Sequence, residues 1–371
     1  MNTILFFNNL LSGQLIFRID IINHFHNKGY KIIIVAPPAD ENTYNLPKGV
    51  EFIPLKFDRT STSVLGDIKL FAGIYKILKQ KKPQYVFNYT IKPNIYGAIA
   101  AKLLGIHNTD MIAGLGYTFI SKSFSSKIAR LLYKVGLKCT DKLMLLNKHD
   151  VEKVTLLNLC KKEKIIWLEG GEGVNLLSYP YFDNHSSITT FLFIGRLIEE
   201  KGYNIFVKAA SIIKKKYPKT RFWILGDFDL SYPNAISKET IQNDEKYNGI
   251  EYLGVSKNML DFYSKPGVVI CIPSFYSEGL NRSLMEGCAT GKPIITCDNQ
   301  GCRETCKDGI NGFLVPPKDT EAIAKAMEQY ILLTQEQKQA FSLASRQLAE
   351  EKFDVKNTIK IYEDISSNFL K

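Results

Sequence analysis

The sequence lacks the patterns that mark several large classes of protein. None of its uninterrupted apolar runs approaches the ~18 residues that a membrane-spanning helix needs, so we do not expect a transmembrane protein. Its first residues show neither a positively charged start nor a small-residue cleavage site, so we expect no signal peptide and a chain that stays in the cytoplasm. It contains no collagen-like or coiled-coil repeat and no low-complexity tract.

The common signatures of metal and nicotinamide sites are also missing. The seven cysteines include no C-x-x-C pair, and the five histidines form no H-E-x-x-H. Gly13 lies near the first strand–helix turn, but no G-x-G-x-x-G surrounds it. We interpret Cys302 and Cys306, four residues apart, as inert thiols, and the D-x-D at 227–229 as part of a loop. We therefore expect no metal and no cofactor.

What is present is an ordinary globular composition with an uneven charge. At ~150 residues per domain, 371 residues indicate two domains or one large one, and 45% hydrophobic with 23% charged residues argues against a disordered chain. The net charge is +11, and residues 1–185 alone hold 24 Lys and Arg against 14 Asp and Glu. A basic half beside a nearly neutral half indicates an anionic partner: nucleic acid, a membrane or a substrate.

Short apolar runs alternate with helical patterns, and the series occurs twice. This predicts an α/β protein of two Rossmann-like domains, each with a parallel sheet. The glycine-rich segment 170–175 marks the junction, so we expect an N-terminal domain over 1–172, a C-terminal domain over 173–352 and an amphipathic helix over 353–371. The strand-like runs are 3–7, 31–36, 85–88, 143–146, 165–168, 190–194, 222–225, 268–272 and 293–296, and the first helix is expected at 17–28.

The most informative segment follows a buried strand-like run and reads SFYSEGLNRSLME, residues 274–286. It places Glu278 in a loop and Glu286 two turns into the helix that follows. The backbone amides of Asn281 to Leu284 would open that helix and direct its positive end at an anion. Glu286 would then lie where a ribose diol can donate to it. The alternative is a helix-capping Glu278 and a solvated Glu286.

A second motif, G-R-x4-K-G, follows the strand-like run 190–194. It brings Arg196 and Lys201 to the start of the next helix. A guanidinium fork and an ammonium point charge both suit a diphosphate, and two cations can stabilise leaving-group charge without a metal. The alternative is a pair of surface cations on an ordinary strand–helix loop.

These two cations and the E-x7-E element together resemble the family 4 retaining glycosyltransferases. The stretch PIITCDNQGCRETCKDGINGFLVPPKD at 293–319 is similar to that family's sequence after the second Glu, and G-V-N at 173–175 to its domain junction. The resemblance covers most of the chain. It implies the GT-B fold, in which two Rossmann-like domains face a cleft and the C-terminal helix 353–371 crosses back to the N-terminal domain.

The N-terminal half is similar to a narrower, PglA/CapM-like group, which adds sugars to undecaprenyl-diphosphate-linked glycans for capsules, O-antigens or glycoproteins. This resemblance rests on four short motifs: Phe17-Arg18, Phe57-Asp58-Arg59, Lys92-Pro93-Asn94 and Gly114-Leu115-Gly116. It implies that the acceptor is bound by seven residues of this half: Gly13, Arg18, Arg59, Lys92, Asn94, Gly114 and Gly116.

For the C-terminal half, the resemblance implies binding of the donor. Arg196 and Lys201 would hold the diphosphate, Glu286 the ribose and Glu278 the sugar hydroxyls, and Arg196, Lys201 and Glu278 would be catalytic. Asn281 stands where many relatives have Pro, a departure that bears on which sugar is selected. The other implied donor-binding residues are Gly195, Gly226, Leu253, Gly254, Gly279, Leu280, Asn281, Arg282, Ser283 and Leu284.

The implied reaction moves a hexose or N-acetylhexosamine, with retention, from a nucleotide sugar, most often UDP-linked, to an undecaprenyl-diphosphate-linked saccharide. Front-face attack, in which the leaving phosphate accepts the acceptor's proton, is favoured over double displacement through Glu278. Two alternatives are a GT-B enzyme of another reaction, such as a nucleotide-sugar epimerase, and a nucleic-acid-binding protein. The intact set of cations and carboxylates disfavours the first. No nucleic-acid motif supports the second, so we expect no nucleic-acid partner.

The segment 121–142 mixes Lys and Arg with apolar residues at helical spacing. A basic amphipathic helix of this kind suits the headgroup layer of an anionic membrane. A helix that packs on its own sheet with its Lys residues outward is an equal alternative. Because a polyprenyl acceptor must be met at the bilayer, we expect a cytoplasmic protein associated peripherally with the inner face of the cytoplasmic membrane through its basic N-terminal domain.

Overall fold

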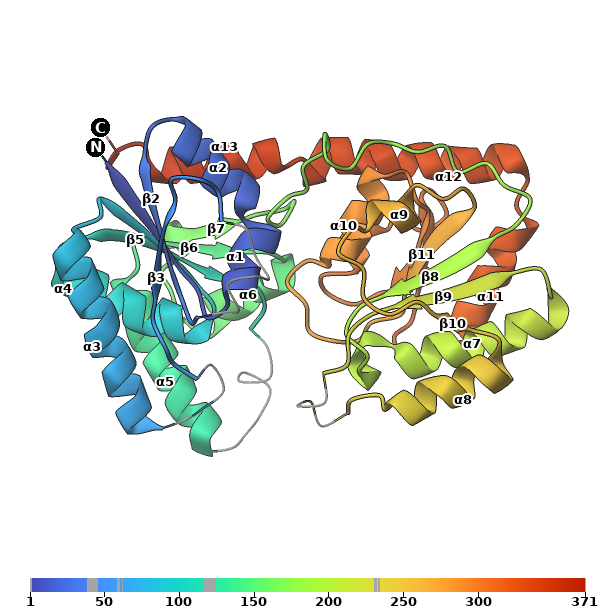
Figure 1. Ribbon diagram of the computed structural model, residues 1–371, viewed down its shortest axis with the longest axis horizontal. Coiled ribbons are helices and arrows are strands. Elements are labelled where there is room, and N and C mark those ends of the chain that lie inside the picture. The colour runs from blue at the N-terminus through green and yellow to red at the C-terminus, as the bar shows by residue number, and fades with distance from the viewer. Residues whose placement is uncertain are drawn as a thin grey trace. The chain divides into compact units, whose positions relative to one another are not determined.

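The computed structural model describes residues 2–38, 46–58, 61, 63–115, 124–229, 232 and 234–370, without the side chains of 124–127 and 129. The chain folds as two compact units. Unit 1 comprises Met1–Gly173 and Val355–Lys371, and unit 2 comprises Val174–Asp354. Each unit is a parallel sheet with helices on both faces (Figure 1). The predicted α/β fold of two Rossmann-like domains is therefore confirmed.

Unit 1 has seven parallel strands in the order β3-β2-β1-β4-β5-β6-β7. They are β1 (Thr3–Phe7), β2 (Lys31–Ala36), β3 (Glu51–Pro54), β4 (Tyr85–Tyr89), β5 (His107–Ile112), β6 (Lys142–Leu145) and β7 (Ile165–Trp167). The helical segments are α1 (Leu11–Phe17), α2 (Ile19–Asn27), α3 (Val64–Lys81), the π-helical turn η1 (Pro93–Gly97), α4 (Ala98–Leu103), α5 (Phe124–Cys139), α6 (Lys148–Leu156), η3 (Lys162–Lys164) and α13 (Val355–Ser366).

The two faces of the unit 1 sheet bury different residues of β1. Ile4 and Phe6 enter a core shared with α2 and α13, whereas Leu5 and Phe7 enter a core shared with α3. Every residue of β1 is therefore buried, and the strand is apolar almost throughout because helices cover both faces of the parallel sheet.

The C-terminal helix α13 completes the core of unit 1. The ring of Tyr362 lies 4.8 Å from that of Phe87, and its hydroxyl bonds to the hydroxyl of Tyr89 at 3.0 Å. The hydroxyl of Thr358 donates to the carbonyl of Gly171 at 3.2 Å. The end of the chain thus belongs to the N-terminal unit, as the family resemblance implied.

Unit 2 has six parallel strands in the order β10-β9-β8-β11-β12-β13. They are β8 (Thr190–Ile194), β9 (Arg221–Leu225), β10 (Glu251–Tyr252), β11 (Val268–Ile272), β12 (Ile294–Cys297) and β13 (Gly312–Val315). The helical segments are η4 (Glu199–Lys201), α7 (Tyr203–Lys216), α8 (Lys238–Asn248), α9 (Leu260–Tyr263), α10 (Arg282–Ala289), η5 (Arg303–Thr305), α11 (Thr320–Leu332), α12 (Gln335–Leu348) and η6 (Ala349–Phe353).

The charge separates cleanly between the two units. Unit 1 holds 27 Lys and Arg against 15 Asp and Glu, a net charge of +12, whereas unit 2 holds 21 against 22, a net charge of −1. Among the described residues, none of the helices combines the length and apolar content that crossing a membrane requires. All seven cysteines are free, and six of them are buried.

The structure adds elements to unit 1 that the sequence did not predict. The helix expected over 17–28 is present as α2, but a further helix, α1, precedes it, and the two are separated at Arg18. Strand β5 was not predicted, because it lacks an apolar run: Asn108, Thr109 and Asp110 are three consecutive polar residues, and all of them are buried. Asn88 of the neighbouring strand donates to the Asp110 carboxyl group at 2.9 Å, and burial raises the pKa of that carboxyl group well above its usual value.

Lys292 gives the folded protein a measurable dependence on pH. Its buried ammonium donates to Asn184 Oδ1 at 2.9 Å and to the Lys265 carbonyl at 3.2 Å, and burial lowers its pKa to about 8. The unfolded chain, with an ordinary lysine pKa of 10.5, therefore holds more protons between these two values. This group makes the free energy of unfolding rise as the pH increases from about 8 to about 10.

We predict that Lys292→Met removes this rise, as measured by urea unfolding at pH 8 and pH 10. Lys257→Met, at an exposed position of the same unit, is the matched control and should behave as the wild type. An unchanged pH dependence in Lys292→Met would contradict the assignment.

Candidate functional site

Glycines bring three strand ends of unit 2 together. The amide of Gly195, after β8, donates to the Leu225 carbonyl of β9 at 3.0 Å, and the amide of Gly226 donates to the Gly254 carbonyl at 2.9 Å. A Cβ on Gly226 would lie 1.9 Å from the carbonyl oxygen of Gly195, so only glycine fits there. Leu253, next to Gly254, is half-exposed at the same edge. The structure thus brings together these four expected donor-binding residues.

A second close approach carries Lys201 to the loop that follows β11. Gly202 has a φ of 86°, and a Cβ there would lie 2.2 Å from the carbonyl oxygen of Pro273. The Phe275 amide also donates to the Glu200 carbonyl at 2.9 Å. The two motifs, almost 80 residues apart in sequence, are therefore held against each other by backbone contacts.

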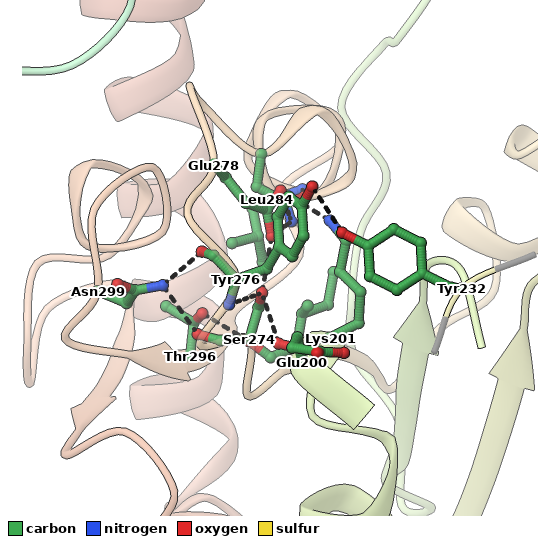
Figure 2. A network of polar contacts seen from close by, with 11 residues as sticks. Glu200, Lys201, Tyr232, Ser274, Tyr276, Glu278, Leu284, Thr296 and Asn299 are labelled. Carbon is green, nitrogen blue, oxygen red and sulfur yellow. Dashed lines mark hydrogen bonds and ion pairs between the residues drawn. The ribbon is translucent and has the colours of Figure 1, made fainter. Parts of the chain in front are cut away.

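Glu278 and Lys201 meet at this point. The Lys201 ammonium lies 2.8 Å from Glu278 Oε2, and the two side chains are only 13% and 10% exposed. Ser274 Oγ donates to Glu278 Oε1 at 2.8 Å, and the Asn281 amide nitrogen lies 3.1 and 3.0 Å from the two carboxylate oxygens. Figure 2 shows Ser274 and Lys201 beside Glu278. The carboxylate is thus held by charge-assisted hydrogen bonds.

The segment after β12 contacts the loop that carries Glu278. Asn299 Nδ2 donates to the Tyr276 carbonyl at 2.7 Å (Figure 2), and Gly301, with a φ of 79°, lies so close that a Cβ on it would be 2.9 Å from Glu278 Cβ. The Gly301 amide in turn donates to Glu304 at 2.8 Å. The sequence drew attention to this stretch only by resemblance, because nothing in its local pattern reveals the contact with Glu278.

Helix α10 begins at Asn281, which acts as the N-cap. Its side-chain oxygen accepts from the Leu284 amide at 3.1 Å, and its own amide donates to the Gly301 carbonyl at 2.8 Å. Two of the four amides that we expected to face an anion are therefore already engaged. A proline at position 281 would lose the bond to Gly301, which is a structural consequence of the departure from the family pattern.

Glu286 is buried rather than solvated, being 6% exposed. Its Oε1 accepts from Arg282 Nε at 2.8 Å and from the Tyr179 hydroxyl at 2.9 Å, and its Oε2 accepts from the Tyr263 hydroxyl at 3.3 Å. Burial raises the pKa of both tyrosines above their usual value, so both hydroxyls keep their protons. Tyr179 comes from the segment after the junction and Tyr263 from α9, and sequence reasoning missed both.

Arg196 pairs with the last residue of the D-x-D. Its Nη1 lies 3.1 Å from Asp229 Oδ2, and its guanidinium carbon lies 5.0 and 5.3 Å from the ring centroids of Tyr232 and Tyr276. Within the described part of the chain, no group of three or more His, Cys, Asp or Glu residues is arranged to hold a metal ion. The D-x-D thus supplies a partner for a cation of the protein itself.

In unit 1, Arg18 is a buried structural cation. Its Nε lies 2.7 Å from Glu172 Oε1, its Nη2 donates to Glu172 Oε2 at 2.8 Å, and its Nη1 donates to the Gly13 carbonyl at 2.8 Å. The guanidinium also stacks 3.9 Å from the ring centroid of Tyr89. Arg18, between α1 and α2, is thus bonded to Glu172 at the domain junction. Its bond to the Gly13 carbonyl also orients Gly13.

The other expected acceptor residues follow the central strands of the unit 1 sheet. Lys92, after β4, pairs with Asp67 at 2.7 Å, and the buried Asn94 donates to the Met111 carbonyl at 2.7 Å. Gly114, after β5, has a φ of 138°. The two remaining expected residues, Arg59 and Gly116, lie outside the described residues.

Thr90 is a further residue of interest that the sequence did not reveal. It directly follows β4 and has a φ of 73°, which is a strained conformation for a β-branched residue, and the π-helical turn η1 begins three residues later. Backbone strain and π-helical turns concentrate at functional sites, and here Thr90 and η1 lie on either side of Lys92.

Two family models match the chain. Residues 3–147 match the family described as "Glycosyl transferase 4-like", and residues 188–332 match "Glycosyl transferases group 1". The chain belongs to the family 4-like glycosyltransferases. The transferase thus carries one matched segment in each unit.

Relatives agree with this assignment over the whole length. The transferase is 25% identical, over 95% of its own chain and 96% of the relative, to the N,N'-diacetylbacillosaminyl-diphospho-undecaprenol alpha-1,3-N-acetylgalactosaminyltransferase of Campylobacter jejuni. It is 22% identical, over 94% and 93%, to the capsular polysaccharide biosynthesis glycosyltransferase CapM of Staphylococcus aureus. The crystal structure of Anabaena HepE in complex with UDP-glucose matches 99% of this chain and 100% of that one, with a TM-score of 0.78 at 16% identity, which supports the GT-B fold.

We predict that Asn281→Ala lowers the free energy of unfolding by about 1 kcal/mol, because α10 loses its cap, and also lowers transfer activity, because Glu278 loses an amide donor. Asn281→Ser is the matched variant: it keeps the cap but is too short to replace the amide. It should restore stability in urea unfolding while activity stays low. If Asn281→Ala unfolds like the wild type, the capping role is wrong.

Proposed function

We propose that the transferase moves a hexose or N-acetylhexosamine, with retention, from a nucleotide sugar, most often UDP-linked, to an undecaprenyl-diphosphate-linked saccharide. The observation that carries this proposal is the contact between Lys201 and Glu278, which lies beside Arg196 in unit 2. The Campylobacter relative, by its name, acts on a diphospho-undecaprenol acceptor, and the Staphylococcus relative acts in capsule synthesis. Capsule, O-antigen or a related surface glycan is therefore the setting we propose.

Arg196 and Lys201 have the charges that a donor diphosphate requires. In the structure, Asp229 pairs with Arg196 and Glu278 pairs with Lys201, so two carboxylates balance two cations. The diphosphate of a nucleotide sugar carries two negative charges and can replace the carboxylates charge for charge. Once released from Lys201, Glu278 remains hydrogen-bonded to Asn281 and is available to the hydroxyls of the sugar.

Glu286 suits the ribose of the donor. Arg282 and Tyr179 fix its Oε1, while Oε2 accepts a longer bond from Tyr263. A carboxylate oxygen has more than one acceptor position, so Oε2 can also take a ribose hydroxyl. A preorganised carboxylate of this kind binds a diol without first losing side-chain entropy.

The residues around the sugar position favour front-face attack. Cleavage of the donor leaves charge on the diphosphate, and two cations placed there stabilise it in the transition state. The departing phosphate then accepts the proton of the acceptor hydroxyl. Both oxygens of Glu278 are held by hydrogen-bond donors, which suits binding of hydroxyls better than nucleophilic attack in a double displacement.

Unit 1 is the proposed acceptor unit. It carries a net charge of +12, and Gly13, Lys92, Asn94 and Gly114 lie after β1, β4 and β5, which are adjacent strands. Ligands of open parallel sheets bind outside the carboxyl ends of the strands, where the strand order reverses, and in unit 1 this occurs between β1 and β4. A lipid diphosphate is an anion that such a basic unit attracts.

Helix α5 supports association with an anionic membrane. Its outward face carries Ile128, Leu131 and Val135, which are 45%, 63% and 44% exposed, whereas Tyr133 and Leu137 are buried. An outward apolar stripe is not what a helix with only lysines outward would show. Basic residues flank the stripe on the same helix, as a peripheral membrane helix requires.

We predict that Glu286→Ala lowers kcat/KM for the nucleotide sugar about 100-fold, as expected when a charged hydrogen bond to the ligand is lost. Glu286→Gln keeps the hydroxyl contacts and should lose less. Exposed Glu321→Ala, in the same unit, is the control. The rate is measured by mass spectrometry with a panel of UDP- and GDP-sugars, and circular dichroism checks the fold. Normal kcat/KM in a folded Glu286→Ala protein would refute the ribose assignment.

We further predict that the triple variant Arg130→Gln, Lys134→Gln and Lys138→Gln binds anionic vesicles about 100-fold more weakly at low salt, at roughly 1 kcal/mol per basic residue. The matched control changes three exposed lysines of unit 2, Lys238, Lys246 and Lys257, to Gln. Equal cosedimentation of the two triple variants would reject the role of α5.

A further inference from the structure

Tyr276 touches both cations of the proposed diphosphate site. The centroid of its ring lies 5.3 Å from the guanidinium carbon of Arg196 and 5.6 Å from the Lys201 ammonium nitrogen. Both distances are within the range of a cation–π interaction. Figure 2 shows the ring of Tyr276 beside Lys201 and Glu278, at the centre of the polar network.

One ring serves two cations that would otherwise repel each other. The face of an aromatic ring is negative, so it attracts both positive groups without adding a formal charge. This matters when the carboxylates of Asp229 and Glu278 give way to a diphosphate, because during the exchange the ring is the contact that both cations keep. A third carboxylate could not do this, since it would repel the incoming phosphate.

Tyr276 is itself held by three hydrogen bonds, one at its hydroxyl and two at its backbone. The Tyr232 hydroxyl donates to the Tyr276 hydroxyl at 3.1 Å, Asn299 binds the Tyr276 carbonyl at 2.7 Å, and the Tyr276 amide donates to Ser274 Oγ at 3.3 Å. Burial raises the pKa of Tyr232 to about 12, so its hydroxyl keeps the proton that it donates. Tyr232 also faces Arg196, which therefore lies against two tyrosine rings joined by their hydroxyls.

We propose that Tyr276, braced by Tyr232, is a positioning residue that holds Arg196 and Lys201 together in the arrangement that binds the diphosphate of the donor. The proposal rests on the proposed function and adds to it two residues to which neither the motifs nor the family resemblance had assigned a role. It places Tyr276 behind the cations, where it acts through them on the diphosphate.

The role predicts an effect that depends on the second phosphate. The probe is whichever of UDP, GDP and ADP binds the wild-type chain most tightly in isothermal titration calorimetry, together with the matching nucleoside monophosphate. Loss of the ring in Tyr276→Leu should weaken diphosphate binding about 5- to 30-fold, which corresponds to a cation–π contribution of about 1–2 kcal/mol. Binding of the monophosphate should change less, because it offers one phosphate to the two cations.

The conservative variants separate the ring from its hydroxyl. Tyr276→Phe keeps the ring and should retain most of the affinity. Tyr232→Phe, like Tyr276→Phe, removes the bond between the two hydroxyls, and its loss of affinity should likewise be smaller than that of Tyr276→Leu. Fluorinated phenylalanines at position 276, which retain the shape and weaken the negative face, should reduce affinity step by step. A role in structure alone would leave this series flat.

The neighbouring residue provides a matched control. Phe275 lies in the same loop and has an ammonium group over its ring in the same way, but that ammonium belongs to Lys318, with its nitrogen 4.7 Å from the ring centroid. Phe275→Leu should therefore leave unchanged the ratio of the affinity for the nucleoside diphosphate to the affinity for the nucleoside monophosphate.

The outcomes distinguish this inference from the proposed function. If the wild type binds none of the three nucleoside diphosphates, the proposed function fails and this inference fails with it. If the wild type binds one and Tyr276→Leu binds it equally well, or loses affinity for the monophosphate to the same extent, only the role of Tyr276 is overturned.

Discussion

The proposed donor site of unit 2 depends on the ion pair between Lys201 and Glu278. Each residue comes from a loop at the carboxyl end of a different strand, and the pair forms only because the two loops touch at the backbone, where Gly202 lies against Pro273. The surrounding contacts serve the same purpose. Asn281 both caps α10 and holds Glu278, and Gly301 lies against Glu278 from the next strand along the sheet. A substitution at any of these points changes where the charges lie.

The diphosphate site that we propose lies in a nearly neutral unit. Unit 2 has a net charge of −1, yet it concentrates two cations within reach of one tyrosine ring and keeps each paired with a carboxylate. Unit 1 has a net charge of +12 and an outward apolar stripe on α5. The two arrangements fit the two anions that we propose as ligands: a small diphosphate that must be held at fixed atoms, and a lipid diphosphate in a membrane, which is attracted over a distance.

The sequence predicted the features that linear patterns encode. Apolar runs gave the positions of most strands, and the E-x7-E and G-R-x4-K-G motifs marked loops that the structure places together, because each follows a strand of the same parallel sheet. It could not reveal contacts between distant segments. Tyr179 and Tyr263 reach Glu286 from two other parts of the unit, and Asp229 reaches Arg196 from a third. Strand β5 was missed because three of its buried residues, Asn108, Thr109 and Asp110, are polar.

The most direct test of the account is product analysis by mass spectrometry, with the full chain, a panel of UDP- and GDP-sugars and a synthetic undecaprenyl-diphosphate-linked saccharide in anionic vesicles. The account predicts that one nucleotide sugar lengthens the lipid-linked saccharide by a single hexose or N-acetylhexosamine, and that NMR finds the anomeric configuration of the donor retained in the product. Release of free sugar alone, epimerisation of the donor, or a product with inverted configuration would contradict it.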